Sequence, residues 1–279
     1  MVGSSEKVVR IGLAAPGTRM DPALAERVTA FAAELYGPRV ELIFHPQCFL
    51  SSGHFAGDDD ARAAAILDIA NDPGFDALWF ARGGYGACRI AETVIPQLNE
   101  AAQAKAWLGY SDIGFLLAGL RRAGFPRIAH GPMPVDMARE GGEAAVRRGL
   151  SWLVDGATSA LERGVTPGHP NLAFNLTILS QLLGTPLEPD FSGAVILLED
   201  VGEYMYRLDR YFFHVTSNPN VQRCAGLRLG RCSAIPSNDP DFGMTEEEVA
   251  RFWCARSGIP YLGRADIGHD NENKVVPFG

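Results

Sequence analysis

The sequence has no long apolar run and no cluster of basic residues. No stretch reaches the roughly 20 consecutive apolar residues that a transmembrane helix needs. The 33 acidic side chains outnumber the 25 lysines and arginines, which gives a formal net charge of −8. Nucleic acids and anionic membranes are bound mainly through clustered Lys and Arg. We therefore expect neither a nucleic acid nor a membrane as a partner.

Cysteine is scarce, and a secretion signal is missing. The five cysteines are scattered without a C-x-x-C pair, and their odd number does not indicate a complete disulfide framework. Residues 1–7 are polar, and the apolar segment after them is interrupted by Arg10 and ends at Pro16 and Gly17. This pattern does not form a signal-peptide core. We expect a cytoplasmic protein.

Motifs for metals and nucleotides are also lacking. None of the six histidines belongs to an H-x-x-x-H or H-E-x-x-H pair, which are spacings typical of zinc ligands on a helix. The sequence contains no G-x-x-x-x-G-K-[ST] loop, and its glycine-rich segments do not have the spacing of a dinucleotide-binding loop. We predict no metal site, and the sequence has no recognisable nucleotide-binding motif.

The first half of the chain alternates short apolar runs with amphipathic segments. Such alternation predicts a parallel sheet covered by helices. The predicted strands are 8–15, 40–45, 75–81, 107–110 and 127–130, and the predicted helices are 24–35, 59–70, 113–120 and 143–154. We place this N-terminal α/β domain at residues 1–155.

A second domain follows a segment that is poor in bulky apolar residues. Residues 156–170 are rich in Gly, Thr, Ser and Pro, which is typical of a linker. The predicted elements beyond it are a helix at 171–183, a strand at 194–198, helices at 204–215 and 245–253, and a final segment at 261–269. We predict a mixed domain at 171–279.

Ser111 stands where a strand pattern gives way to a helical one. It lies in Leu108-Gly-Tyr-Ser-Asp-Ile-Gly114, with glycines two residues before it and three after it. A serine on such a turn projects its Oγ, and the N–H of the next residue, Asp112, can stabilise an oxyanion. The motif is not G-x-S-x-G, and a serine at a helix start is usually an N-cap. Both interpretations stay open at this point.

A glycine loop and a pair of acids also follow apolar strands. Glycines at Gly83 and Gly84 let backbone N–H groups approach an anion, although a plain tight turn explains them equally well. Glu199 and Asp200 end the apolar run 194–198, and ionised groups at a buried strand end need a partner. The partner is either a catalytic group or an arginine such as Arg207 or Arg210.

His269 is the remaining candidate for proton transfer. It lies in the polar segment 267–273 after a short strand pattern. An imidazole there can move protons near neutral pH. A lone histidine in a loop is more often an ordinary surface residue, so the sequence pattern alone does not assign it a role.

Taken together, segments along nearly the whole chain resemble the serine LD-carboxypeptidases that trim cell-wall peptides, the muramoyltetrapeptide carboxypeptidase family. Several motifs in one order are far more specific than any one of them. The matching segments are Ala14-Ala-Pro-Gly17, Ala81-Arg-Gly-Gly-Tyr-Gly86, Gly109-Tyr-Ser-Asp112, His130-Gly-Pro132, Asn175-Leu-Thr177, Leu183-Gly-Thr185, Leu198-Glu-Asp-Val-Gly-Glu203, Tyr206-Arg-Leu-Asp-Arg210 and Gly268-His269.

The resemblance implies a catalytic triad of Ser111, Glu199 and His269. It implies an oxyanion hole made by backbone N–H groups of Gly83 or Gly84 and of Asp112. Arg82 and Tyr85 are candidates for substrate binding. It further implies an N-terminal parallel α/β domain, a C-terminal domain around a small β-barrel-like sheet, a homodimer and no cofactor.

The implied reaction is hydrolysis of the bond between a diamino acid and terminal D-Ala in a peptidoglycan tetrapeptide, in murein recycling. Two departures from the family bear on substrate fit and stability: Ala173-Phe174 stands where two glycines are usual, and the chain ends at 276–279 where relatives continue into one more strand.

Three alternatives remain. A microcin C immunity-type peptidase uses the same triad on aminoacyl-nucleotide analogues and needs an aromatic platform; we expect the four tryptophans in the core instead. The others are an inactive muropeptide-binding module and a nucleotide-binding α/β protein.

Overall fold

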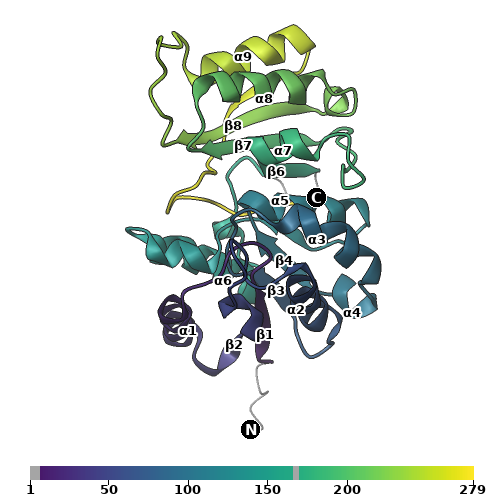
Figure 1. Ribbon diagram of the computed structural model, residues 1–279, viewed down its shortest axis with the longest axis vertical. Coiled ribbons are helices and arrows are strands. Elements are labelled where there is room, and N and C mark those ends of the chain that lie inside the picture. Colours follow the sequence, from purple (N-terminus) through teal and green to yellow (C-terminus); the bar gives the residue numbers. More distant parts are fainter. Residues whose placement is uncertain (1–6, 166–169) are drawn as a thin grey trace.

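The computed structural model describes residues 7–165 and 170–279. Its first layer is a six-stranded sheet in the order β10-β5-β4-β3-β1-β2 (Figure 1). Five of these strands run parallel, and all residues of β3 and β4 are buried, as expected for a sheet covered on both faces. The parallel strands are β1 (Val9–Ala14), β2 (Val40–Phe44), β3 (Ala77–Phe80), β4 (Ala106–Gly109) and β5 (Ile128–His130).

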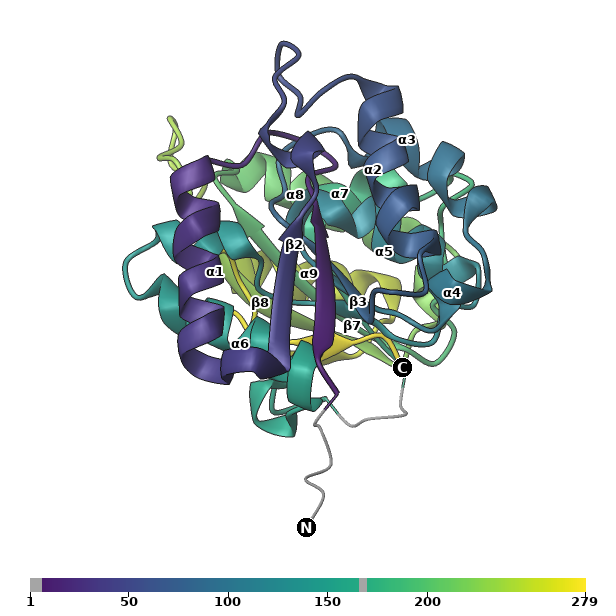
Figure 2. The same ribbon diagram turned by 90° about the horizontal axis from the view of Figure 1, so that it is seen from below.

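Helices cover both faces of this sheet. Figure 2 shows α1 and α6 on one side of β1 and β2, and α2, α3 and α5 on the other. Two separate groups of buried side chains fill these interfaces, one including Val28 and Val146, the other Ile66, Ile90 and Leu117. The helices are α1 (Pro22–Tyr36), α2 (Asp59–Asn71), α3 (Ala87–Val94), α4 (Glu100–Gln103), α5 (Gly114–Arg122) and α6 (Gly142–Asp155).

A second, smaller sheet carries the rest of the chain. Its four strands are all parallel, in the order β6-β7-β8-β9, and α8 and α9 lie on its side away from the first sheet (Figure 1). The elements are β6 (Asn171–Asn175), α7 (Leu176–Leu182), β7 (Val195–Val201), α8 (Met205–Ser217), β8 (Gly226–Ser233), α9 (Glu246–Ser257) and β9 (Tyr261–Arg264).

The α/β class with two sheets is confirmed, while two local expectations need correction. The small sheet is open rather than barrel-like, because its four described strands are too few to close on themselves and β6 and β9 lie at opposite edges. The helix expected at 171–183 begins only at Leu176, since the preceding five residues form the fully buried strand β6. Asn175 accepts a hydrogen bond from the N–H of Ile178 and so caps α7.

The end of the chain returns to the first sheet. β10 (Val276–Pro277) pairs antiparallel with β5, so the last residues do not belong to the second sheet that precedes them. Phe278 packs against Phe174 with ring centroids 5.5 Å apart. The bulk of Phe174 is thereby accommodated in the core rather than in an open groove.

The division at 1–155, 156–170 and 171–279 stays a prediction. Within the predicted linker, Leu161 forms an isolated bridge with Val275, and residues 166–169 lie outside the described residues, as do residues 1–6. Among the helices that the structure describes, none is long and apolar enough to cross a membrane.

Candidate active site

Ser111 occupies a strained turn between β4 and α5. Its φ is +62°, a left-handed conformation that a residue with a Cβ rarely adopts unless its surroundings impose it. Gly109 makes the turn possible, because a Cβ on it would lie 2.9 Å from a methyl carbon of Ile113 and 3.0 Å from the ring of Phe80. The serine side chain is therefore held out of the turn, as the sequence pattern predicts.

A continuous chain of hydrogen bonds joins Ser111, His269 and Glu199. Ser111 Oγ lies 3.0 Å from His269 Nε2, and His269 Nδ1 lies 2.5 Å from Glu199 Oε2. The Glu199 side chain is completely buried at an irregularity in the pairing of β7 with β8. In this order of groups the imidazole can accept the hydroxyl proton while the carboxylate stabilises the charged ring.

The electrostatics of His269 favour proton uptake. Burial opposes a charge on the ring, but the attraction of Glu199 and its hydrogen bond outweigh burial and raise the pKa of His269 above its usual value of 6.5. The arginines proposed as alternative partners of Glu199 lie elsewhere: Arg207 pairs with Glu203, and Arg210 lies over the ring of Tyr206.

The glycine loop after β3 packs directly against Ser111. A Cβ on Gly83 would lie 3.2 Å from Ser111 Cβ and 3.4 Å from its Oγ, so a side chain there would crowd the hydroxyl. Gly84 has φ +85° and packs against Thr18. The predicted glycine loop and Ser111 therefore lie in direct contact.

Two buried ionisable side chains, Asp112 and Arg62, hydrogen-bond to the backbone around the glycine loop. Asp112 Oδ2 accepts a hydrogen bond of 2.7 Å from the N–H of Ala87, which ties the serine turn to the start of α3. Burial raises the pKa of Asp112 to about 6. The completely buried Arg62 donates to the carbonyls of Gly86 and Pro16. These contacts hold the glycine loop against the serine turn.

The two candidates for substrate binding contact the loops that follow β1 and β2. Arg82 donates through Nη1 to the carbonyl of Arg19 at 2.9 Å. Tyr85 is 54% exposed and lies against His54 and Phe55. Both residues flank the glycine loop, on its rim.

Sequence reasoning missed a group beneath His269. Tyr110 donates to the buried Asp136 at 2.7 Å, and Arg139 donates to the same carboxylate at 3.0 Å and to the hydroxyl of Tyr110 at 3.2 Å. Arg139 also donates to the backbone carbonyl of His269, whose ring centroid lies 4.8 Å from that of Tyr110. No motif records this group, although Tyr110 is the direct neighbour of Ser111.

A second arginine holds the same loop further along. Arg148 on α6 donates through Nε to the carbonyl of Asn273 at 3.0 Å and through Nη2 to that of Asn271. Because Arg139 and Arg148 both precede the second sheet in sequence, the loop bearing His269 is attached to the first part of the molecule by two guanidinium groups.

His130, from one of the matching segments, lies next to this group without titrating near neutral pH. It is fully buried, its ring centroid is 5.5 Å from that of Tyr110, and burial lowers the pKa of His130 to about 4. Across residues 7–165 and 170–279, no group of three or more His, Cys, Asp or Glu side chains is arranged to hold a metal ion.

Two domain models of one protein family match most of the chain. The model of the LD-carboxypeptidase N-terminal domain matches residues 11–131, and that of the LD-carboxypeptidase C-terminal domain matches residues 172–279. The chain belongs to the LD-carboxypeptidase family. The first match contains Ser111 and the glycine loop, and the second contains Glu199 and His269.

Two sequences illustrate the relationship to other LD-carboxypeptidases. A Synechocystis sp. protein that bears a carboxypeptidase name is 32% identical and covers 86% of this chain and 79% of its own. The murein tetrapeptide carboxypeptidase of Pseudomonas aeruginosa is 27% identical and covers 97% of this chain and 91% of its own.

Solved structures share the LD-carboxypeptidase fold. Muramoyltetrapeptide carboxypeptidase from Oxalobacter formigenes is 22% identical, with a TM-score of 0.79 over 97% of this chain and 93% of that chain. The microcin C7 self-immunity protein MccF is 16% identical, with a TM-score of 0.79 over 97% of this chain and 91% of that chain. At these identities the likeness concerns the fold alone.

Proposed function

We propose that this LD-carboxypeptidase is a serine enzyme that hydrolyses the bond between the L-centre of a diamino acid and terminal D-Ala in peptidoglycan tetrapeptides. The observation that carries the proposal is the hydrogen-bonded chain from Ser111 through His269 to Glu199. The names of the murein-acting relatives support the choice of substrate.

In the proposed reaction Ser111 Oγ attacks the carbonyl carbon of the diamino acid while His269 Nε2 takes the serine proton. His269 then gives this proton to the amine of the leaving D-Ala, and Glu199 stabilises the imidazolium between the two steps. Backbone N–H groups of Gly83 or Gly84 and of Asp112 stabilise the oxyanion. Water, activated by His269, then hydrolyses the acyl-serine ester and releases the tripeptide.

The test is release of D-Ala from L-Ala-γ-D-Glu-meso-diaminopimelyl-D-Ala, followed by mass spectrometry. We expect release by the wild type and a loss of at least about a thousandfold in Ser111→Ala, the scale for a triad nucleophile. Ser192→Ala is the matched control, because its exposed hydroxyl bonds only within its own turn and to Arg223. Release that persists in Ser111→Ala would contradict the mechanism.

A second candidate is cleavage of aminoacyl-nucleotide analogues by the same three residues. MccF has been solved with glutamyl sulfamoyl guanosine. Of the four tryptophans expected in the core, Trp79 and Trp107 are buried, whereas Trp152 and Trp253 are partly buried and pack against the core from its edge. Tyr204 and Tyr206 form an exposed stacked pair with ring centroids 5.3 Å apart. Glutamate release from glutamyl sulfamoyl adenosine, with no D-Ala release from the tetrapeptide, would favour this candidate over the first.

We further propose that the enzyme acts in the cytoplasm, on recycled murein peptides, as a homodimer. These expectations rest on the family resemblance. Light scattering of the purified protein measures the oligomeric state, and a mass near the 30.1 kDa of one chain would overturn the dimer.

A further inference from the structure

A cationic hollow of about 330 Å³ lies beside the glycine loop. Its lining comes from the segments that follow β1, β2 and β3, so it opens at the carboxyl edge of the first sheet, where β4 also delivers Ser111. Adjacent strands are about 4.8 Å apart, and β3 is the neighbour of β4. The lining residues are Arg19, Met20, Asp21, Pro22, Phe49 and Arg82.

The chain connects this hollow directly to the hydroxyl. Arg82 immediately precedes Gly83, which packs against Ser111, and the segment with Arg19 follows Thr18, which packs against Gly84. Any group bound by Arg82 and Arg19 is therefore held next to the loop that borders the serine.

The two guanidinium groups are available for an anion. In the described part of the chain neither Arg19 nor Arg82 forms an ion pair, and the buried Nε of Arg82 has no hydrogen-bond partner. The acid in the hollow is already engaged, because Asp21 Oδ1 accepts a hydrogen bond of 2.8 Å from the N–H of Ala23 as the cap of α1. Guanidinium groups that form no ion pair and line a hollow are suited to bind a carboxylate.

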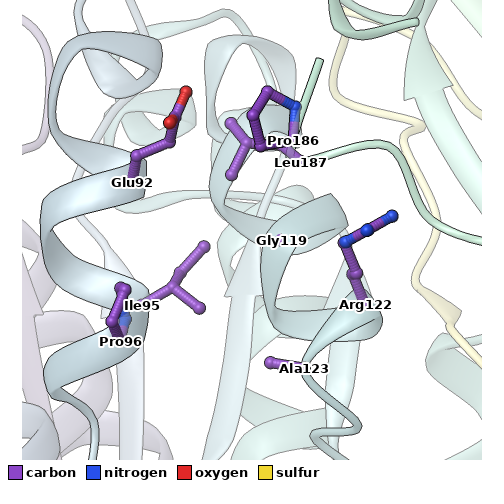
Figure 3. A pocket seen from close by; sticks show the side chains of 8 residues that line it. All are labelled: Glu92, Ile95, Pro96, Gly119, Arg122, Ala123, Pro186 and Leu187. Atoms are coloured by element: carbon purple, nitrogen blue, oxygen red, sulfur yellow. The ribbon is translucent and has the colours of Figure 1, made fainter. Parts of the chain in front are cut away.

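A second hollow shows the contrast (Figure 3). It measures about 350 Å³ and is lined mainly by apolar side chains, with Glu92 and Arg122 beside them. Arg122 lies at the end of α5 opposite to the serine turn and donates to the carbonyl of Glu188 at 2.8 Å. This hollow is lined by α3, α5 and residues 186–187 rather than by the segments next to the glycine loop, so we assign it no ligand.

We propose that Arg82 and Arg19 form a subsite for a carboxylate of the peptide substrate. The inference rests on the proposed function and deepens it, because it makes the substrate an anionic peptide whose carboxylate lies close to the scissile bond. The carboxylate belongs either to the terminal D-Ala or to the side chain of the diamino acid, and the same guanidinium chemistry recognises both.

The test compares Arg82→Gln and Arg19→Gln with the wild type on the tetrapeptide, with Arg122→Gln as the matched control. We expect KM to rise at least about tenfold in Arg82→Gln and less in the exposed Arg19→Gln, as for loss of a charge-assisted hydrogen bond. The turnover number kcat should stay within about threefold, and Arg122→Gln should leave both constants unchanged. Arg82→Lys should recover part of the loss by retaining the charge.

Substrate amides identify the carboxylate. Amidation of the recognised carboxylate raises KM for the wild type but not further for Arg82→Gln, because the variant has already lost the contact. If the D-Ala amide raises KM for the wild type alone, the recognised group is the terminal carboxylate. If the diaminopimelate side-chain amide does so, the recognised group is the side-chain carboxylate. If both amides raise KM by the same factor in Arg82→Gln as in the wild type, the subsite is wrong. An unchanged KM for the tetrapeptide in both arginine variants would also contradict it.

Failure of the proposed function is distinguishable from failure of the subsite. If the wild type releases no D-Ala, calorimetric binding of the intact tetrapeptide to the wild type and to Arg82→Gln still measures recognition. Weaker binding to the variant supports the subsite without the reaction, and equal binding contradicts it. If Arg82→Gln does not fold by circular dichroism, the exposed Arg19→Gln decides the question by the same criteria.

Discussion

The two walls of the site are positioned in different ways. On the first wall, Ser111 and the glycine loop follow neighbouring parallel strands, and short-range backbone geometry fixes them: a left-handed φ at Ser111 and close packing at Gly83 and Gly109. On the second wall, Glu199 is rigid within β7, but His269 lies in a loop between β9 and β10. That loop is held from the opposite wall by Arg139 and Arg148, and from its own sheet by Arg231 on β8, which pairs with Asp266 and Asp270.

This difference distinguishes residues that take part in the reaction from residues that only position them. Changes at the three hydrogen-bonded residues remove the reacting or charge-stabilising groups, whereas changes at Arg139 and Arg148 leave those groups present and loosen their geometry. A misplacement of about 1 Å can reduce turnover by two orders of magnitude. Variants of the two kinds should therefore fall into distinct ranges of activity.

The largest of these effects is expected for Glu199→Gln, with a loss of about a thousandfold or more in kcat. An amide cannot stabilise the imidazolium and favours the wrong tautomer of His269. The matched control is Asp200→Asn, the next residue along β7. Its carboxylate bonds to Asn175 and Thr177 instead, so we expect reduced stability in urea with kcat reduced less than tenfold. Similar kcat losses in the two variants would contradict the assignment.

Arg139→Ala should reduce kcat/KM by about 10- to 100-fold, because the His269 carbonyl loses its donor. The same change at Arg148, which holds the loop two to four residues further on, should cost less than about fivefold. Steady-state kinetics on the tetrapeptide measure both, with Arg147→Ala, whose guanidinium lies over Phe31, as a control on the same helix. Equal losses of kcat/KM in the two variants would contradict the idea that Arg139 aligns the His269 ring while Arg148 only attaches the loop.

The pH profile probes the same wall. His269 acts as a base only when neutral, and Glu199 raises the pKa of His269 above 6.5, so kcat/KM should fall as the pH drops through a midpoint above 6.5. In Glu199→Gln the residual activity should show this midpoint at lower pH, because burial then acts without the opposing attraction. A midpoint that stays in place would mean that another group controls the profile.

The smallest effect is expected for Tyr110→Phe. The change removes the hydroxyl that donates to Asp136 and accepts from Arg139, which should cost about 1 kcal/mol in the free energy of unfolding. Activity should change by less than about fivefold, because Asp136 and Arg139 still contact each other directly. Urea unfolding and steady-state kinetics on the same preparation measure both quantities, and a loss as large as that of Arg139→Ala would make Tyr110 the main support of the loop.

The sequence allows prediction of the first wall far better than of the second. The run Leu108 to Gly114 contains both the strand end and the glycines that the serine turn needs. The position of Ser111 on a turn can therefore be predicted from the local sequence pattern. Glu199 can be predicted as a buried acid because it directly follows the apolar run 194–198. His269 cannot be assigned from local pattern, because its position depends on contacts far apart in the sequence. Its ring bonds to Glu199, and its loop is held by Arg139, Arg148 and Arg231.

The strands and helices differ in the same way in how well the local sequence pattern predicts them. The alternation of strands and helices in the first domain follows directly from the apolar pattern. The strand β6 does not, because the five residues before Leu176 are buried by pairing with β7 and continue without a break into α7. The return of β10 to the first sheet is likewise a tertiary contact, made by a two-residue strand.

The central claim, that His269 and Glu199 activate Ser111, is tested most directly by a fluorophosphonate, which phosphonylates an activated serine with loss of fluoride. Peptide mass spectrometry should find the adduct on Ser111 in the wild type, with labelling at least about a hundredfold slower in His269→Ala and Glu199→Gln. An adduct on a different serine, or equal labelling rates in the wild type and His269→Ala, would contradict the account.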